Sequence, residues 1–549
     1  MRKRRSFLVS LLLVLMLLFG LAPSTRAGGG IKVAPTPAKP ASGTISIMAG
    51  TPGSWYVGAT PPNVSYSKPV LLFVHGKGGA AESWWTDTVY HGHNDMYDYA
   101  YYYGYRTAFV DLYPDKDMWL NGEMLSQQIN AITAYFGVPK VTIVAHSKGG
   151  VDSNAASAWY GASPKITRVV TLSTPHWGTP IADMAYSTWT WWLAELMGER
   201  NDATYVMQTG YMSYFRSITD GRDPTVPYYT LSGNKCGPIG TALWMSCAFI
   251  GGQDDGLVSV TSARKPGDHF VYDGYWDHDE IRMGSRSWAY FQPYILTASV
   301  GAENVAGIGR QLASAGALPS GAAAAAAATP AVDREEAPGN VILRGGLTGG
   351  AAVPAFPVES GVRSARFTIY SSSPAMTATL TGPDGTAYTV QTDAAVPADD
   401  VFAGAWAGTV EVAAPQAGAW SLSATAAEST GFLMVAALDS DLQATLAVSQ
   451  PVATPGALQE LTVGFGPGRA VAACQARAEV GPRGKAERGR PDFAAAGNGQ
   501  KAVLHVPDGN AIHNVTATVT GTLTDGSAFE RTLVSSFAAV APADRGQWK

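Results

Sequence analysis

The stretch V-T-I-V-A-H-S-K-G-G, residues 141–150, decides the fold of this chain. It begins with a short apolar run rich in β-branched side chains, which predicts a strand buried on both faces. Residues 151–160 are compatible with a helix. Ser147 therefore lies on a sharp turn from strand to helix, which exposes its hydroxyl above the sheet. The small residues Ala145 and Gly149 leave room for such a turn and predict a nucleophilic serine.

The surrounding residues repeat the alternation of strand and helix. Further continuous apolar runs at 69–75, 107–112 and 166–172 predict buried strands. Residues 120–136 precede the serine strand and place apolar side chains at helical spacing, namely Leu125, Ile129, Ile132 and Phe136. This order predicts an α/β fold with a doubly wound, mostly parallel sheet.

An acid and a base follow the serine along the chain. Asp255 lies in G-G-Q-D-D-G-L-V, residues 251–258, and His278 lies in Y-W-D-H-D-E, residues 275–280. Serine needs a base because its hydroxyl is a poor nucleophile near neutral pH, and the imidazole needs a carboxylate to fix its tautomer. We predict a triad of Ser147, Asp255 and His278, with His269 as the alternative base.

The segment H-G-K-G-G, residues 75–79, ends an earlier apolar strand. In the strand–turn–helix arrangement predicted here, backbone amides after such a strand and after the nucleophile stabilise an oxyanion. We expect these donors to be the backbone N–H groups of Lys77 and Lys148, and not their ammonium groups. The alternative interpretation is a plain glycine loop.

The N-terminal residues predict export. A basic start, M-R-K-R-R, is followed by the apolar run 7–21 and by A-P-S-T-R-A, which has Thr25 and Ala27 at the small positions of a cleavage site. This pattern predicts a signal peptide over residues 1–27 and a secreted protein. The apolar run is shorter than the roughly 20 residues that a membrane-spanning helix needs. Arg4 and Arg5 also resemble a twin-arginine signal, but the very apolar run favours the ordinary secretory route.

Net charge indicates which classes of binding partner to expect, and the cysteines indicate a disulfide. A net charge of −5 does not point to nucleic acid or to an anionic membrane surface as a partner. Of the three cysteines, Cys236 and Cys247 close a short loop and are predicted to form a disulfide in an oxidising compartment, whereas Cys474 is interpreted as a buried apolar residue. No cysteine or histidine spacing is typical of a zinc site.

Composition divides the chain after the signal peptide. Residues 40–300 form the predicted α/β domain, and residues 301–338, rich in Ala, Gly and Pro, read as a linker. The rest has short alternating runs separated by turns such as G-P-D-G at 382–385. It predicts one or two β-sandwich modules, over 339–440 and 441–549.

Taken together, these motifs resemble the bacterial secreted lipases and esterases of the α/β-hydrolase superfamily, of the A-H-S-x-G type. The matching segments are V-H-G-K-G-G (74–79), V-A-H-S-K-G-G (144–150), S-T-P-H-W-G-T-P-I-A-D (173–183), D-D-G-L-V-S-V (254–260) and D-H-D-E (277–280). The resemblance covers residues 65–290 and implies that Ser147, Asp255 and His278 are catalytic. Ala145 departs from the glycine that usually begins the serine motif.

The resemblance also raises the questions of a structural calcium site and of a lid over the active site. Such enzymes often bind a structural calcium through two aspartates, one of them two places after the catalytic histidine. Glu280 stands at that place here, so we assert no calcium and expect no cofactor. A metal site at His91, His93 and Asp95 is weighed and set aside in favour of surface or supporting roles. The candidate lid, equally interpretable as a core helix, comprises Trp189, Trp191, Trp192, Leu193, Leu196 and Met197.

The expected function is that of a secreted carboxylic-ester hydrolase, a lipase or carboxylesterase, whose partner is an ester substrate. One alternative is an extracellular polyhydroxyalkanoate depolymerase whose β-modules dock on solid polymer. Another is a non-catalytic surface-binding protein that retains a relic hydrolase domain. The oligomeric state stays open.

Overall fold

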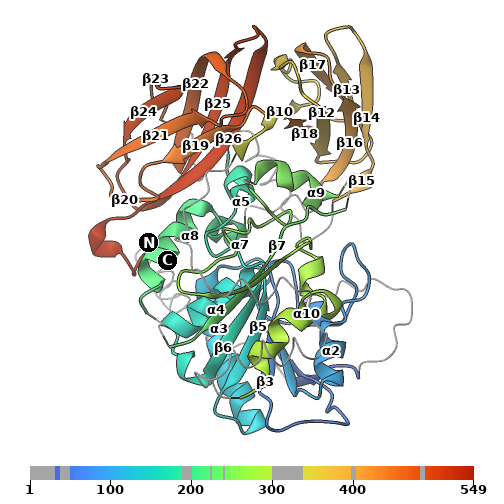
Figure 1. The fold of residues 1–549 in the computed structure, drawn as a ribbon, viewed down its shortest axis with the longest axis vertical. Helices are drawn as coiled ribbons and strands as arrows, with labels where there is room; N and C mark the ends of the chain where they lie inside the picture. The colour runs from blue at the N-terminus through green and yellow to red at the C-terminus, as the bar shows by residue number, and fades with distance from the viewer. Residues whose placement is uncertain are drawn as a thin grey trace, which may run out of the picture.

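The structure is a computed structural model that describes residues 31–36, 50–187, 201–222, 225–238, 241–250, 252–298, 338–396, 404–482 and 489–549. The predicted signal peptide at 1–27, most of the predicted linker and the candidate lid lie outside the described residues. Figure 1 shows an α/β domain with two β-modules beside each other at one of its ends. The helices α5 (Pro180–Ala185), α8 (Thr209–Thr219) and α9 (Ala242–Ser246) lie where the domain meets these modules.

An eight-stranded sheet forms the centre of the α/β domain, with the strand order β1-β2-β4-β3-β5-β6-β7-β8. The strands are β1 (Ile31–Val33), β2 (Trp55–Val57), β3 (Val70–Val74), β4 (Thr107–Val110), β5 (Val141–His146), β6 (Ile166–Leu172), β7 (Tyr228–Gly233) and β8 (His269–Gly274). Only the pairing of β2 with β4 is antiparallel among the described strands of this sheet. Every residue of β3, β4, β5, β6 and β7 is buried, as continuous apolar runs require. The predicted fold class is confirmed.

Helices cover both faces of the sheet. On one face, α3 (Met118–Phe136) buries Leu125, Ile129 and Ile132 against the strands. Asp117 caps this helix by accepting the amides of Trp119 and Leu120, each at 2.9 Å. In the described part of the chain, no helix has the length and apolar character needed to cross a membrane.

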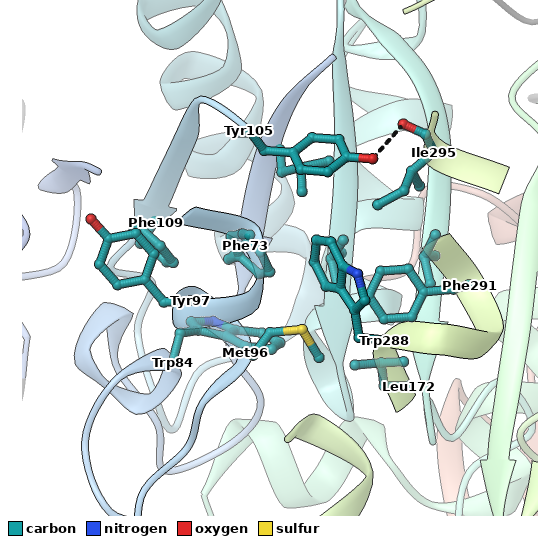
Figure 2. Packing of buried hydrophobic residues seen from close by; sticks show 14 of the residues in the cluster. Phe73, Trp84, Met96, Tyr97, Tyr105, Phe109, Leu172, Trp288, Phe291 and Ile295 are labelled. Carbon is teal, nitrogen blue, oxygen red and sulfur yellow. Dashed lines mark hydrogen bonds between the residues drawn. The ribbon is translucent and has the colours of Figure 1, made fainter. Parts of the chain in front are cut away.

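An aromatic cluster fills the opposite face of the sheet (Figure 2). Phe73 and Phe109 stack at 4.9 Å, and Trp84 and Trp288 pack into the same cluster. The covering elements are η1 (Ala81–Trp84), α2 (Met96–Tyr102), α10 (Gly284–Phe291) and η5 (Gln292–Ile295). Helix α10 begins six residues after the predicted base, His278. By packing against α10, the aromatic cluster fixes the chain that follows this base.

The C-terminal half forms two β-sandwich modules. The first pairs sheet β10-β18-β12-β16-β15 with sheet β11-β17-β13-β14, and the second pairs β23-β24-β21-β19-β9 with β20-β26-β25-β22. The strands of the first are β10 (Val341–Leu347), β11 (Phe356–Val358), β12 (Ser364–Ser371), β13 (Met376–Thr381), β14 (Ala387–Thr392), β15 (Ala394–Ala395), β16 (Trp406–Ala413), β17 (Gly418–Thr425) and β18 (Gly431–Asp439). Those of the second are β9 (Pro338–Gly339), β19 (Ala444–Val448), β20 (Val452–Ala453), β21 (Leu458–Phe465), β22 (Val471–Pro482), β23 (Ala494–Ala496), β24 (Gly499–His505), β25 (Ala511–Leu523) and β26 (Ala528–Ala539).

Strand β26 joins all three parts of the molecule. It packs against α5 and α8 of the α/β domain and against β10 and β11 of the first module. The hydroxyl of Ser536 donates to Asp183 at 2.6 Å and accepts the amide of Gly210 at 2.8 Å. The second module therefore lies against α8, which in turn packs on α4 (Lys148–Trp159), the helix that follows Ser147.

Two buried ion pairs hold the modules together at β26. Arg531 binds Glu359, whose side chain is fully buried, with Nη1 to Oε2 at 3.0 Å. Arg344 binds Glu530 through two contacts of 2.7 and 2.9 Å. A buried pair stabilises little against an apolar substitute, but removal of one partner leaves an uncompensated buried charge.

We expect Arg531→Met to leave the Glu359 carboxylate without its cation and to lower the free energy of unfolding by about 3–5 kcal/mol. Urea unfolding of the full chain measures this loss. Arg363→Met is the matched control, because Arg363 forms an exposed pair with Asp439 and solvent screens such pairs, so that they contribute little to stability. Equal losses in the two variants would contradict the assignment.

Candidate active site

Ser147 lies at the turn between β5 and α4, with a backbone that L-residues rarely adopt. Its φ is 52° and its ψ is −133°. The amide of Ser147 donates to the carbonyl of Leu172 at 2.9 Å, which ties the turn to the end of β6. Strained non-glycine backbone of this kind is maintained by the surrounding structure and clusters at functional sites.

Three glycines allow the chain to close around this turn. A Cβ on Gly76 would lie 2.8 Å from the Cβ of Ser147, and one on Gly149 would lie 2.4 Å from the carbonyl oxygen of His75. A Cβ on Gly150 would lie 2.1 Å from the hydroxyl of Thr174. The ends of β3, β5 and β6 therefore meet at Ser147 with no space for side chains at these positions.

The structure brings the three predicted triad residues together. Nε2 of His278 lies 2.9 Å from Oγ of Ser147, and Nδ1 of His278 lies 2.8 Å from Oδ2 of Asp255. Because an ionised carboxylate only accepts hydrogen bonds, the proton belongs on Nδ1, which leaves Nε2 to accept the serine hydroxyl. In this arrangement the imidazole can remove a proton from the hydroxyl as it attacks a carbonyl carbon.

Backbone contacts hold the acid and the base. The second oxygen of Asp255 accepts the amides of Leu257 and Val258 at 3.0 and 2.8 Å. The carbonyl oxygen of Asp255 accepts the amide of His278 at 2.9 Å. The loops that carry Asp255 and His278 are therefore joined by a backbone hydrogen bond as well as by the contact between the two side chains.

His146 is a supporting residue that the sequence did not reveal. Its Nε2–H donates to the carbonyl oxygen of His278 at 2.8 Å, and the two rings lie 4.7 Å apart. Burial holds the pKa of His146 well below its usual range, with further contributions from the charges of His278 and Arg282. A neutral His146 thus anchors the backbone of the base. Its position directly before the serine was the one available signal.

His269, the alternative base, lies at the opposite end of strand β8 from the segment that carries His278. It is the first residue of β8, whereas Gly274 ends that strand next to the segment that carries His278. Five residues of strand span about 17 Å. The His269 ring instead stacks on Tyr229 at 5.0 Å.

The segment expected to supply oxyanion donors lies against Ser147 through Gly76. His75 shapes it, because Nδ1–H donates to the carbonyl of Gly76 at 2.8 Å and Nε2 accepts the amide of Leu112 at 3.0 Å. Burial lowers the pKa of His75. Lys148 begins α4, so its N–H belongs to the helix start, where amides lack intrahelical partners. The donor roles of Lys77 and Lys148 stay predictions.

The side chain of Lys148 is committed elsewhere. Its ammonium is buried and donates to Oδ1 of Asp152 at 2.6 Å, one helical turn further along α4. The other oxygen of Asp152 accepts from Asn121 at 3.1 Å. Burial raises the pKa of Asp152 to about 6, against the lowering effect of Lys148. The pair links the turn at Ser147 to helix α3.

The acidic residues beside His278 do not fit the calcium site that the resemblance implies. Glu280, at the expected place, accepts Lys235 Nζ at 2.7 Å and Arg286 at 3.1 Å. Asp279 accepts Nε of Arg282 at 3.0 Å. These carboxylates already have side-chain cations as partners.

The histidine pair weighed as a metal site is divided between different acids. His91 contacts Asp277 at 2.8 Å, and His93 contacts Asp98 at 2.9 Å. Asp95 accepts the amide of Ser285. His91 and Asp277 support the loop of the base, which agrees with a supporting role for His91.

The predicted disulfide is confirmed: Cys236 and Cys247 are bonded. Cys474 is partly buried on β22. The disulfide loop begins directly after Lys235 and ends eight residues before Asp255. The loop therefore lies in the sequence between Lys235, which contacts Glu280, and Asp255, which contacts His278.

Comparison with known proteins gives matches among solved structures, whereas no protein-family model and no curated protein matches the chain. The propeptide form of the Bacillus licheniformis lipase BlEst2 is 28% identical with a TM-score of 0.67, over 89% of this chain and 99% of that one. The mature form of the same lipase is 40% identical over 45% of this chain and 99% of that one, with a TM-score of 0.42. The chain belongs to the lipases and esterases of the α/β-hydrolase superfamily.

Proposed function

We propose that this protein is a secreted serine carboxylic-ester hydrolase that works through an acyl-enzyme. The observation that carries the proposal is the continuous contact from Asp255 through His278 to Ser147, at 2.8 and 2.9 Å, on a strained turn. The kinship with lipases and esterases supports ester substrates. The disulfide supports secretion, because such bonds persist in oxidising compartments.

The contacts of Asp255, His278 and Ser147 support a mechanism of acyl transfer. Ser147 attacks the ester carbonyl while Nε2 of His278 takes its proton, and Asp255 stabilises the imidazolium. The backbone amides of Lys77 and Lys148 hold the tetrahedral oxyanion. His278 returns the proton to the leaving alcohol, and water then cleaves the acyl-enzyme with the same base.

Ser147→Ala and His278→Asn should each lower kcat/KM for a nitrophenyl ester by about 10³-fold or more, because nucleophile and base act as a unit. His269→Asn is the matched control and should retain wild-type activity. Wild-type rates in Ser147→Ala would refute the enzymatic proposal and favour a relic domain.

The substrate class is proposed to be fatty-acyl esters, since the similar solved protein is named a lipase. Esters graded from acetyl to palmitoyl, assayed beside a polyester film, test this assignment. We expect turnover of the soluble and emulsified esters. Release of hydroxyacid oligomers from the film, with poor cleavage of short esters, would favour the polyester depolymerase.

We further propose that the chain is a precursor. The similar lipase is known in a propeptide form and in a mature form, and the mature form matches a share of this chain comparable to residues 50–298. The α/β domain would then be the mature enzyme, and the β-modules would belong to the part that is removed.

Asp254, the residue before the proposed acid Asp255, makes the stability of the folded protein depend on pH. Its carboxyl accepts the amide of Gly256 at 2.8 Å and lies near the sulfurs of Cys236 and Cys247. Burial, with the adjacent charge of Asp255, raises the pKa of Asp254 to about 8. Asp254 is therefore neutral at neutral pH.

Asp254→Asn should remove a pH-dependent destabilisation. In the wild type the folded state keeps this proton up to about pH 8 while the unfolded state loses it near pH 4, so stability declines as pH rises through this window, by up to about 1.4 kcal/mol per pH unit. Urea unfolding at pH 5, 7 and 9 should show the variant gaining stability over wild type as pH increases. The exposed Glu123→Gln should follow wild type, and parallel curves for Asp254→Asn would contradict the prediction.

A further inference from the structure

Lys235 lies on a segment that runs beside the segment carrying His278. It lies two residues after the end of β7, and its amide donates to the carbonyl of Trp276 at 3.2 Å. The amide of Asn234 donates to Gly274 at 3.0 Å in the same way. The two segments thus continue the pairing of β7 and β8 beyond the end of the sheet, up to the residue before Asp277.

The ammonium of Lys235 contacts carboxylates on both sides of His278. It lies 2.7 Å from Oε2 of Glu280 and 3.9 Å from Oδ2 of Asp277. Both carboxylates are buried, whereas Lys235 is about one-quarter exposed, at 27%. The other oxygen of Asp277 accepts the amides of Asp279 and Glu280, at 3.0 and 2.9 Å. Asp277 therefore closes a tight turn around His278, and Lys235 binds both ends of that turn.

Charge explains why this turn needs a cation. Asp277, Asp279 and Glu280 place three carboxylates within two residues of His278. Arg282 binds Asp279. Asp277 contacts both His91 and Lys235, and Glu280 contacts Lys235 and the more exposed Arg286. Burial acts to raise the pKa of Glu280, but the hydrogen bond and charge of Lys235, together with the charge of His91 and the amide of Asp277, outweigh it, so that the pKa lies below its usual range.

Ligand atoms of His91, Asp277 and Glu280 lie within 4.8 Å of one another, close enough to share one cation. The structure places the ammonium of Lys235 against two of these three groups. We propose that Lys235 is a positioning residue for His278, and that its ammonium provides the positive charge that holds the Asp277 and Glu280 carboxylates on either side of this base. The proposal rests on the function proposed above, because it assigns Lys235 a role only if His278 is the base.

A positioning role through charge has a signature that a packing role lacks. His278 faces Asp255 and the ring of His146, and the charge of Arg282 reaches that ring. Loss of the Lys235 ammonium leaves the surroundings of His278 more negative, which favours the protonated imidazole. The acid limb of the kcat/KM profile should then move to higher pH.

The test compares Lys235→Met with Lys235→Arg in the full-length protein, with Lys116→Met as the matched control. Lys116 forms an exposed pair with Asp202 and is not part of the turn that carries His278. We expect Lys235→Met to lower kcat about 10-fold with little change in KM, and to move the acid limb upward by about half a pH unit. Lys235→Arg should restore most of kcat and the wild-type limb, and Lys116→Met should match wild type.

Two further measurements keep the outcome decisive. Glu280→Gln should restore part of the lost kcat in the Lys235→Met background, because the two residues are coupled and their effects are not additive. A chelator should leave the thermal midpoint of the wild type unchanged. A lower midpoint with chelator, or wild-type kcat and pH profile in Lys235→Met, would overturn the proposal. Ser147→Ala in the same assay separates the two proposals. If Ser147→Ala is inactive while Lys235→Met behaves like wild type, only the role of Lys235 is overturned. If Ser147→Ala is active, the proposed function itself fails.

Discussion

The close packing of backbone around Ser147 is the constraint on which the rest of the site depends. The φ of 52° at Ser147 persists because the ends of β3, β5 and β6 meet there without room for side chains at Gly76, Gly149 and Gly150. Such strain is sustained only where the surroundings over-determine it. The buried parallel strands provide that rigidity, since all residues of β3, β5 and β6 are buried.

The base is held by a different kind of force. His278 lies between the end of β8 and η4 (Glu280–Arg282), outside any helix or strand. It is fixed by the hydrogen bond that it donates to Asp255, by the one that its carbonyl accepts from His146, and by the turn that Asp277 closes. The nucleophile thus depends on apolar packing and glycine, whereas the base depends on polar and charged contacts. Polar networks of this kind are sensitive to each member, because an unpaired buried group is costly.

The buried strands were the most predictable part of the molecule. The runs at 141–146 and 166–172 match β5 and β6 in full, because strands covered on both faces show as continuous apolar sequence. The triad order was also readable, since Ser147, Asp255 and His278 stand in motifs that follow strands or turns. After His278 the chain forms a short 3-10 turn, η4, before helix α10 begins.

Other features could not be read locally. The contact of His146 with the carbonyl of His278 joins residues 132 positions apart, and nothing in the sequence around His146 specifies that partner. The pairing of β9 with β19 is similar, since Pro338 and Gly339 join the second β-module before the chain builds the first. The role of Lys235 could not be predicted, because a single lysine before a cysteine matches no motif that indicates a function. Only the fold brings its ammonium to Glu280.

The disulfide has a consequence for how this protein is produced. Cys236 bonds to Cys247 across 11 positions of sequence, and Lys235 stands directly before the first of them. In the reducing cytosol of an expression host both thiols stay unpaired, so the covalent tie beside the lysine is missing even when the buried sheet has assembled. Specific activity of recombinant material would then vary with the redox conditions of the host, although yield and secondary structure look normal.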